Sequence, residues 1–323
     1  MKVFVTRRLP ETVMGRLEKA NEITELRVNP EDRALTRDEL EEGTAWCDIL
    51  LSQLVDPVDS ALMECNSELK LIANYAVGYN NIDVPAATKR GIPVTNTPGV
   101  LDDSTADLTW ALLMAVARRI VEADRYMRDG KYEGWAPTLL MGTDVHHKTL
   151  GIVGLGRIGF ALAQRARGFG MRILYSDLEP KPYAEEVGAE YVDMYTLLRQ
   201  SDFVSLHPFY DKKSHHLIDT RELREMKRSA FLINVSRGPV VNEKVLVKAL
   251  KAGEIAGVAL DVYEREPAME PELAQMDNVV IVPHIASASL ETRTAMGNIA
   301  VDNVLARCRG DALMTCLNPE AAG

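Results

Sequence analysis

The chain has 323 residues, of which 46% are hydrophobic and 26% are charged, and its formal net charge at pH 7 is −10. This is the composition of a globular protein with room for two domains, and it excludes a mostly disordered chain. The longest apolar stretches, such as residues 110–117, are much shorter than the ~20 residues that span a bilayer, so we expect no membrane segment. The opening MKVFVTRRLP has the pattern of a strand that runs into charge, not that of a signal peptide.

No block of lysine or arginine stands out in this acidic chain, so neither nucleic acid nor an acidic membrane surface is an expected partner. A small anionic substrate is compatible with the net charge, because a single local arginine can dominate its own site. The four cysteines form no CxxC pair and have no zinc-ligand spacing; they are Cys47, Cys65, Cys308 and Cys316. We therefore expect reduced thiols in a cytoplasmic protein, and no metal site.

Short apolar strand candidates alternate with amphipathic segments along the first part of the chain. The expected strands are residues 2–6, 23–28, 47–53, 69–76 and 92–96, and the helix-like segments between them include 10–20 and 37–43. Such alternation is typical of βαβ units and of a parallel sheet.

A longer helix is expected next, from Ser104 to about Arg128. Ser104 is a candidate N-cap with Asp107 three residues further on, and apolar residues then recur at helical spacing. A loop rich in glycine, proline and tryptophan follows at residues 130–144.

The second βα series is clearer. Its expected strands are residues 149–153, 171–176, 189–192, 203–207, 230–235, 257–262 and 279–283, and a final helix covers about 289–308 before Gly310. We interpret the chain as two doubly wound α/β domains, centred on residues 1–98 and 99–287, and the pattern alone does not assign the last helix to either.

The sharpest motif is GLGRIG at residues 154–159, directly after the strand TLGIV and at the start of a helix. Asp177 ends the next strand, eighteen positions after Gly159, which completes the context of a dinucleotide fingerprint. Gly154 permits the tight turn, Gly156 lets the backbone approach a pyrophosphate at the helix N-terminus, and Gly159 permits close helix–strand packing. Asp177 would accept hydrogen bonds from the adenosine ribose. The alternative is a plain strand–turn–helix.

Three further signals lie at the ends of expected strands. Arg237 follows the buried strand AFLINV, where a guanidinium can grip a carboxylate through two parallel hydrogen bonds. His284 follows another strand and can act as a general acid or base, while either Glu264 or Glu266 can orient and charge it. Taken singly, each has a structural alternative: a surface ion pair, a packed histidine and a solvated acidic turn.

Together these residue types are the set needed to reduce a 2-oxo acid without a metal. The arginine holds the carboxylate, the histidine protonates the developing alkoxide, and the glutamate keeps the histidine charged. Two other residues at strand ends have less specific roles: Asp261 could cap a loop, and His207, before Pro208, is expected to line a site and not to donate a proton. Surface positions are expected for His146, His147, His215 and His216.

With these residues in place, the chain resembles the D-isomer-specific 2-hydroxyacid dehydrogenases over roughly residues 49–310. The matching stretches are AVGYNNID, VTNTPG, GLGRIG, NVSRG, ALDVYEREP and VPHIAS. Within the family the chain is most similar to the glyoxylate/hydroxypyruvate reductases, through YAVGYNNID, NTPGVLDDSTAD and GTDVHHKTLGIVGLGRIG.

The resemblance implies a substrate side and a cofactor side. It implies the catalytic residues Arg237, Glu266 and His284, and so selects Glu266 over Glu264. It also implies a substrate-carboxylate loop with the N–H groups of Val77 and Gly78, and a small pocket lined by Leu54. The implied cofactor-binding residues are Thr105, Gly154, Leu155, Gly156, Arg157, Ile158, Gly159, Asp177, His207, Val235, Ser236, Asp261 and Ala286.

The resemblance further implies the domain plan and the assembly. Residues 99–287 would form a Rossmann NAD-binding domain, and residues 1–98 with 288–323 a flavodoxin-like substrate domain on which the last helix packs. The protein would be a homodimer built on its cofactor domain. Three positions depart from the family's pattern: His207-Pro208-Phe209 replaces His-x-Pro, Asn80 replaces an acid, and Leu139 stands where glyoxylate reductases often have a tryptophan.

We therefore expect an NAD(P)H-dependent reductase of small 2-oxo acids, with glyoxylate and hydroxypyruvate favoured. NADH is expected over NADPH, because Asp177 and Glu179 would face a 2′-phosphate and the nearest candidate partner, Lys181, follows Pro180. One rival function is a phosphoglycerate-type dehydrogenase, which would usually carry an added regulatory domain. Another is a dinucleotide-sensing corepressor, which would need peptide-docking segments.

Overall fold

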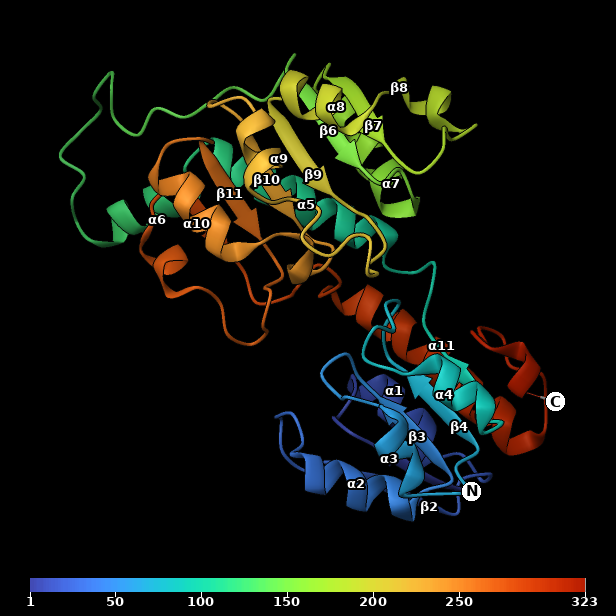
Figure 1. Cartoon of the computed structure of the whole chain (residues 1–323). Helices are drawn as coiled ribbons and strands as arrows, with labels where there is room; N and C mark the ends of the chain where they lie inside the picture. Colours follow the sequence, from blue (N-terminus) through green and yellow to red (C-terminus); the bar gives the residue numbers. More distant parts are fainter. Residues whose placement is uncertain (323) are drawn as a thin grey trace. The chain divides into compact units, whose positions relative to one another are not determined.

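The computed structural model describes residues 1–322, and the chain divides into two compact units (Figure 1). The N-terminal unit comprises Met1–Leu101 together with Ala288–Gly323, and the central unit comprises Asp102–Ser287. Each unit contains one parallel β-sheet with helices packed on it. The expected fold class, two parallel-sheet α/β domains, is confirmed.

The N-terminal unit is built on five parallel strands in the order β2-β1-β3-β4-β5. The strands are β1 (Lys2–Val5), β2 (Glu25–Val28), β3 (Ile49–Ser52), β4 (Leu71–Asn74) and β5 (Val94–Thr95). The helices are α1 (Glu11–Glu18), α2 (Arg37–Trp46), α3 (Ser60–Glu64), α4 (Val84–Lys89) and α11 (Leu290–Arg309), with a 3₁₀ turn, η4, at Pro319–Ala321. The central strands β3 and β4 are buried throughout, which explains their nearly continuous apolar sequences.

The last helix of the chain, α11, packs against α1, β3 and β4 of the N-terminal unit. The Ser289 side chain caps its start by accepting the N–H of Thr292, and Gly310 ends it with a left-handed φ of 78°. Gly310 is the helix end that the sequence predicts. The pattern alone left open which domain this helix packs on, and the family resemblance implied the N-terminal one.

The central unit contains seven parallel strands in the order β12-β11-β10-β9-β6-β7-β8. The strands are β6 (Thr149–Val153), β7 (Arg172–Ser176), β8 (Ala189–Tyr191), β9 (Phe203–Leu206), β10 (Phe231–Asn234), β11 (Gly257–Leu260) and β12 (Val279–Ile281). The helices are α5 (Asp102–Ala117), α6 (Ile120–Arg128), α7 (Arg157–Arg167), α8 (Met194–Gln200), α9 (Thr220–Glu225) and α10 (Glu243–Lys251), with 3₁₀ turns η1 (Ala184–Val187), η2 (Gly238–Val240) and η3 (Pro271–Gln275). Strand order reverses between β6 and β9, which is the crevice where sheets of this type bind dinucleotides.

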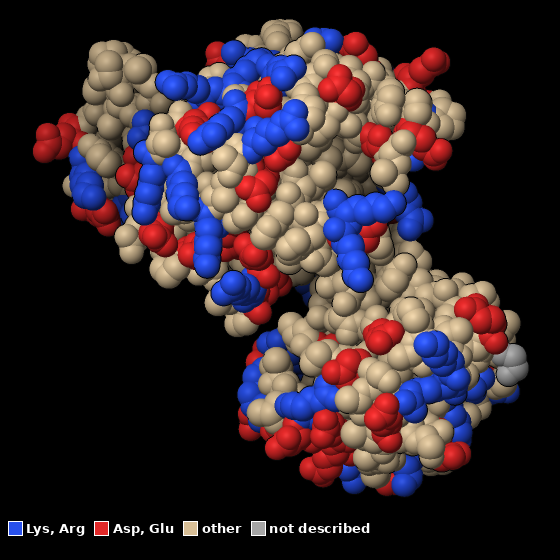
Figure 2. Space-filling view, viewed as in Figure 1, with Lys and Arg blue, Asp and Glu red and all other residues tan. Residues whose placement is uncertain are grey.

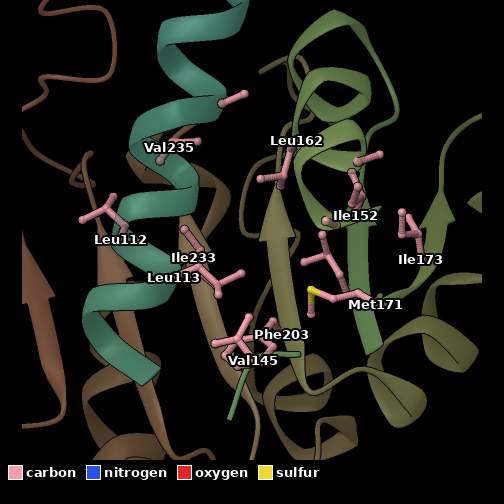
Figure 3. Close-up of a cluster of buried hydrophobic side chains, with 14 of the residues drawn as sticks. Leu112, Leu113, Val145, Ile152, Leu162, Met171, Ile173, Phe203, Ile233 and Val235 are labelled. Atoms are coloured by element: carbon pink, nitrogen blue, oxygen red, sulfur yellow. The ribbon is translucent and has the colours of Figure 1, made fainter. Parts of the chain in front are cut away.

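One hydrophobic core of the central unit lies between α5, α7 and the sheet (Figure 3), and a second lies against α8, α9 and α10. Leu112 and Leu113 of α5 face Ile233 and Val235 at β10, and Leu162 of α7 covers the neighbouring part of the sheet. These side chains are nearly all fully buried, so the packing fixes the helices on the strands and thereby fixes the loops at the strand ends.

The single helix expected from Ser104 to Arg128 is wrong. The chain forms α5 and α6 instead, separated at Arg119, whose φ of 52° is left-handed. The carbonyl of Ala117 accepts a hydrogen bond from the N–H of Thr143, so the returning loop takes an acceptor that a continuous helix would use. Ser104 is also not an N-cap, because α5 already begins at Asp102.

Lysine and arginine side chains are intermingled with acidic ones on the face shown in Figure 2. Ion pairs between basic and acidic side chains are frequent among the described residues, for example Arg199 with Glu225 and Lys227 with Asp202. Within residues 1–322, no helix combines the length and the apolar content that crossing a bilayer requires.

Candidate active site

The loop from β6 to α7 has the geometry of a phosphate cradle. Gly154 has a φ of 91°, and a Cβ there would lie 2.7 Å from the His207 carbonyl oxygen. A Cβ at Gly159 would lie 2.4 Å from the Gly154 oxygen, so both positions need glycine for packing. A Cβ at Gly156, the N-cap of α7, would meet no atom within 4 Å. The space beside Gly156 is therefore open, and a helix N-terminus of this kind can bind a phosphate group.

Asp177 at the end of β7 is tied into the same loop. Its Oδ2 accepts the N–H of Leu155 at 2.9 Å, and its Oδ1 accepts the N–H of Leu178 at 2.7 Å. Although Lys181 follows Pro180, its Nζ lies 3.4 Å from Asp177 Oδ1 and 3.5 Å from Glu179 Oε1. A cation therefore stands beside the two acids, a contact that the sequence around Pro180 did not reveal.

Glu266 and His284 form a hydrogen-bonded pair in the central unit. His284 Nδ1 lies 2.9 Å from Glu266 Oε2, and Glu266 Oε1 accepts the N–H of Tyr263 at 3.1 Å. Burial raises the pKa of Glu266, but the hydrogen bond and charge of His284 outweigh this and leave the pKa below its ordinary value. Glu266 is therefore ionised at neutral pH.

Arg237 lies on the loop after β10, and its main chain is fixed by Asn234. The Asn234 Nδ2 donates to the Arg237 carbonyl at 3.0 Å, and Asn234 Oδ1 accepts the N–H and hydroxyl of Ser236. Burial lowers the pKa of Arg237, while the nearby charge of Glu266 acts in the opposite direction. A guanidinium stays protonated in any case, so a positive charge lies close to the Glu266–His284 pair.

Gly238 brings the Arg237 loop against the loop that carries Glu266. A Cβ at Gly238 would lie 1.8 Å from the carbonyl carbon and oxygen of Tyr263 and 2.4 Å from the Glu264 nitrogen. Only glycine permits this backbone approach, so the glycine after Arg237 is a structural requirement of the site.

Asp261 holds the backbone beyond His284. The carboxylate of Asp261 is fully buried and accepts the N–H groups of Ile285 at 2.6 Å and Ala286 at 2.9 Å. The Tyr263 hydroxyl donates to the Val282 carbonyl at 2.7 Å, and His284 itself has a left-handed φ of 53°. Asp261 thus has the loop-capping contacts that were the alternative to a cofactor contact.

His207 follows β9 and is only partly exposed, with its Nε2 2.8 Å from the Ser205 hydroxyl. Burial lowers its pKa to about 3, so the ring is neutral and cannot serve as a proton donor. His146, His147 and His215 are exposed as expected. His216 is not a simple surface residue, because its Nε2 lies 3.0 Å from Glu264 Oε1.

In the N-terminal unit, the loop after β4 presents two backbone N–H groups. The side chains of Asn74 and Asn96 donate to the carbonyls of Gly78 and Val77, each at 2.9 Å. These bonds fix the peptide planes, and within residues 1–322 neither the Val77 nor the Gly78 N–H has an acceptor. Leu54 lies half-buried on the loop after β3 of the same unit.

The structure thus brings Arg237, Glu266 and His284 together at the carboxyl ends of β10, β11 and β12. The glycine loop, Asp177 and His207 lie at the ends of β6, β7 and β9. The other cofactor candidates in the central unit are Thr105, Val235 and Ala286, which are buried, Ser236, which is half-buried, and Arg157, whose Nε lies 3.4 Å from Asp102. Among the described residues, no group of His, Cys, Asp and Glu is arranged to hold a metal ion.

The sequence interpretation missed Asn234 and Tyr263. Their roles depend on hydrogen bonds, those of Asn234 within its own loop and that of Tyr263 to the carbonyl of Val282. Only for Asn234 was there a signal, because a polar residue ends an otherwise apolar strand.

Comparisons with known proteins show which family the chain resembles. A family model described as "D-isomer specific 2-hydroxyacid dehydrogenase, NAD binding domain" matches residues 110–286. A glyoxylate reductase of Thermococcus litoralis is 51% identical over 99% of this chain and 97% of its own length, and one of Korarchaeum cryptofilum is 49% identical over 99% and 96%. The NADPH-dependent glyoxylate/hydroxypyruvate reductase of Sinorhizobium meliloti, solved with NADP and malonate, has a TM-score of 0.85 and 32% identity over 99% of this chain and 97% of that chain.

Proposed function

The chain belongs to the family of D-isomer specific 2-hydroxyacid dehydrogenases, and on that premise we propose that it reduces glyoxylate and hydroxypyruvate to the corresponding 2-hydroxy acids. The observation that carries the proposal is the contact of 2.9 Å between Glu266 and His284, together with the charge of Arg237, which interacts with Glu266. The glyoxylate reductases at 49% and 51% identity support the choice of substrate.

The cofactor is a nicotinamide dinucleotide, whose bound nicotinamide supplies the hydride. The open space over Gly156 and the N–H groups at the start of α7 would hold the pyrophosphate. The residues proposed to complete this turn are Leu155, Arg157 and Ile158, with Gly154 and Gly159 shaping it. Those proposed nearer the nicotinamide are Thr105, Val235, Ser236, Asp261 and Ala286, with His207 nearer the adenine.

We assign the substrate carboxylate to Arg237, because a planar guanidinium can bind it through two parallel hydrogen bonds. In the N-terminal unit, we propose that the Val77 and Gly78 N–H groups bind substrate and that Leu54 limits the size of the substrate. Malonate in the solved relative is also a small carboxylate, which agrees with a substrate of this class.

The proton comes from His284 in this proposal. Its Nδ1 is held by Glu266, so Nε2 is the ring atom that can deliver a proton to the carbonyl oxygen of the substrate. Arg237 and the His284 N–H together stabilise the charge that develops on the oxygen, while the Glu266 carboxylate balances the positive charge of this pair.

We further propose that NADH is preferred over NADPH, because the Asp177 carboxylate would repel a 2′-phosphate. Lys181 reduces this repulsion through its contact with Asp177. The preference is therefore expected to be about ten-fold, which corresponds to 1.36 kcal/mol, and not absolute.

The experiment is oxidation of NADH and of NADPH by the purified protein with a panel of 2-oxo acids: glyoxylate, hydroxypyruvate, pyruvate, phenylpyruvate and 3-phosphohydroxypyruvate. We expect glyoxylate or hydroxypyruvate to give the highest kcat/KM. Highest activity with the phosphorylated acid would support a phosphoglycerate-type dehydrogenase. Tight NADH binding without turnover of any acid would support the corepressor-like function instead.

A homodimer is proposed from the apolar surface of α6 and the loop 129–144. The exposed large apolar side chains there are Ile120, Val121, Met127, Tyr132, Trp135 and Met141. A surface of this kind is covered in most stable oligomers. Light scattering after size-exclusion chromatography should give a dimer that Trp135→Asp weakens, whereas Met314→Asp, at an exposed residue of the N-terminal unit, should not.

A cytoplasmic location is also proposed. Cys47 is buried, Cys65 is exposed, and Cys308 and Cys316 are half-buried; all four are free thiols. Free thiols are ordinary in reducing compartments. Fractionation of the source cells tests this location.

A further inference from the structure

Glu243 is a buried acid that is not among the residues proposed to bind the substrate, bind the cofactor or donate the proton. It is the first residue of α10, after the N-cap Asn242, and only 3% of its surface is exposed. Burial raises its pKa. A carboxylate in such a place is costly unless its oxygens have hydrogen-bond partners, so its partners indicate what it does.

The carboxylate fastens both ends of one segment of the chain. Glu243 Oε1 accepts the N–H of Glu264, and Glu243 Oε2 accepts the N–H of Glu270 at 3.0 Å. Glu264 returns a bond, because its Oε2 accepts the N–H of Glu243 at 3.2 Å. Residues 264–270 are thereby clamped at their two ends, and Glu266 lies inside the clamped segment.

His216 links the clamped segment to the loop that follows Arg237. His216 Nε2 lies 3.0 Å from the other oxygen of Glu264, and the His216 N–H donates to the carbonyl of Pro239 at 2.8 Å. Pro239 follows Gly238, which touches the backbone of Tyr263. The loops that carry Arg237 and Glu266 are thus joined through hydrogen bonds that do not include either side chain.

We propose that Glu243 is a positioning residue for the reduction, acting through Glu266. The inference rests on the proposed function, in which Glu266 holds His284 for proton donation. A glutamine at position 243 would keep one acceptor oxygen and turn an NH₂ group toward the other backbone N–H, so one end of segment 264–270 would come free. Glu266 would then spend less time in its contact with His284.

Amide hydrogen exchange tests the clamp without any substrate. Glu243→Gln should speed exchange in residues 263–270 and leave β6 and α7 unchanged. The matched control is Glu254→Gln, which removes a partly exposed acid just after α10 whose contact is Arg224. Equal exchange in Glu243→Gln and the wild type would overturn the clamp, whether or not the protein reduces a 2-oxo acid.

A double-mutant cycle tests the role in the reaction. Glu243→Gln should lower kcat about ten-fold, which is part of the 10²–10⁴-fold typical of a general acid, and leave the KM for NADH nearly unchanged. The upper pH limit of kcat should move down, as in Glu266→Gln. Adding Glu243→Gln to Glu266→Gln should cost little more, since one acts through the other. Fully additive losses, or a lower kcat with no change in the pH profile, would show a merely structural role and overturn the proposal.

A second variant covers the case in which Glu243→Gln does not fold. Glu264→Gln breaks the same reciprocal bond from a partly exposed position and should give the same exchange pattern and the same non-additivity with Glu266→Gln. A wild-type protein without turnover of any 2-oxo acid would refute the proposed function, and the exchange experiment would still decide whether the clamp exists.

Discussion

Replacing Glu266 with glutamine should move the pH range of the reductase downward. In the wild-type protein the ionised Glu266 lies 2.9 Å from Nδ1 of His284. Glutamine keeps an oxygen that can hold Nδ1 in place but removes the negative charge. A carboxylate beside a general acid favours the protonated form of that acid, so reduction should fail at a lower pH once the charge is removed.

The size of the shift follows from the distance and the exposure of the pair. Two unit charges about 4 Å apart interact by about 1 kcal/mol in water and about 4 kcal/mol at an effective dielectric constant of 20. The side chains of His284 and Glu266 are 28% and 34% exposed, so solvent screens part of this energy. At 1.36 kcal/mol per pH unit, the upper limit of activity should fall by about one to two units.

The assay is kcat and kcat/KM for glyoxylate reduction measured across pH, for the wild type, Glu266→Gln and Glu272→Gln. Glu272 is an acid in η3 whose contact is Lys251, so its variant controls for the loss of one negative charge. An upper pH limit that does not move in Glu266→Gln would refute the pairing. A shift of equal size in Glu272→Gln would show a general charge effect instead.

The other predictions concern single side chains. His284→Gln should lower kcat by about 10²–10⁴-fold with little change in NADH affinity, and near-normal turnover in stopped-flow assays would exclude it as the acid. Arg237→Lys should lower kcat/KM for glyoxylate by about 10- to 100-fold, because lysine cannot form the bidentate contact; loss of cofactor affinity alone would contradict this. Asp177→Ala should narrow the NADH preference by about ten-fold in fluorescence titrations with both dinucleotides. A wild-type preference for NADPH would refute the role of Asp177.

Periodicity was sufficient to predict every strand but not where each strand ends. The strand predicted at 69–76 is observed as Leu71–Asn74, because the apolar run continues into Tyr75 and Ala76, which are buried in the loop. The short helices α3 and α4 have clear caps at Asp59 and Asp83, yet five or six residues give too little periodicity for a prediction. The break between α5 and α6 depends on Thr143, more than twenty residues further along the chain, which no local pattern contains.

In the candidate site, too, some residues could be predicted from the sequence and others could not. Arg237, His284 and the glycine loop were predictable because side-chain chemistry and strand ends coincide in the sequence. The choice between Glu264 and Glu266 needed the family resemblance, and the structure shows a physical basis for it: Glu266 contacts His284, whereas Glu264 contacts His216. Glu243 could not be predicted, because its partners Glu264 and Glu270 lie on a loop that is distant in the sequence. Lys181 lies only four residues from Asp177, but the sequence does not show that its side chain turns back past Pro180 to reach that carboxylate.

These contacts explain how three loops can hold one reactive arrangement without sharing a helix or a strand. Asp261 fixes the backbone just after His284, and Tyr263 links the Glu266 loop to Val282 just before it. Both residues follow β11, so this one strand end controls the position of the histidine from two sides. The chain thus uses carboxylates near the site for two different purposes. Asp261 and Glu243 have their oxygens occupied by backbone N–H groups and set geometry, whereas Glu266 keeps one oxygen for His284 and therefore supplies charge to the proton donor.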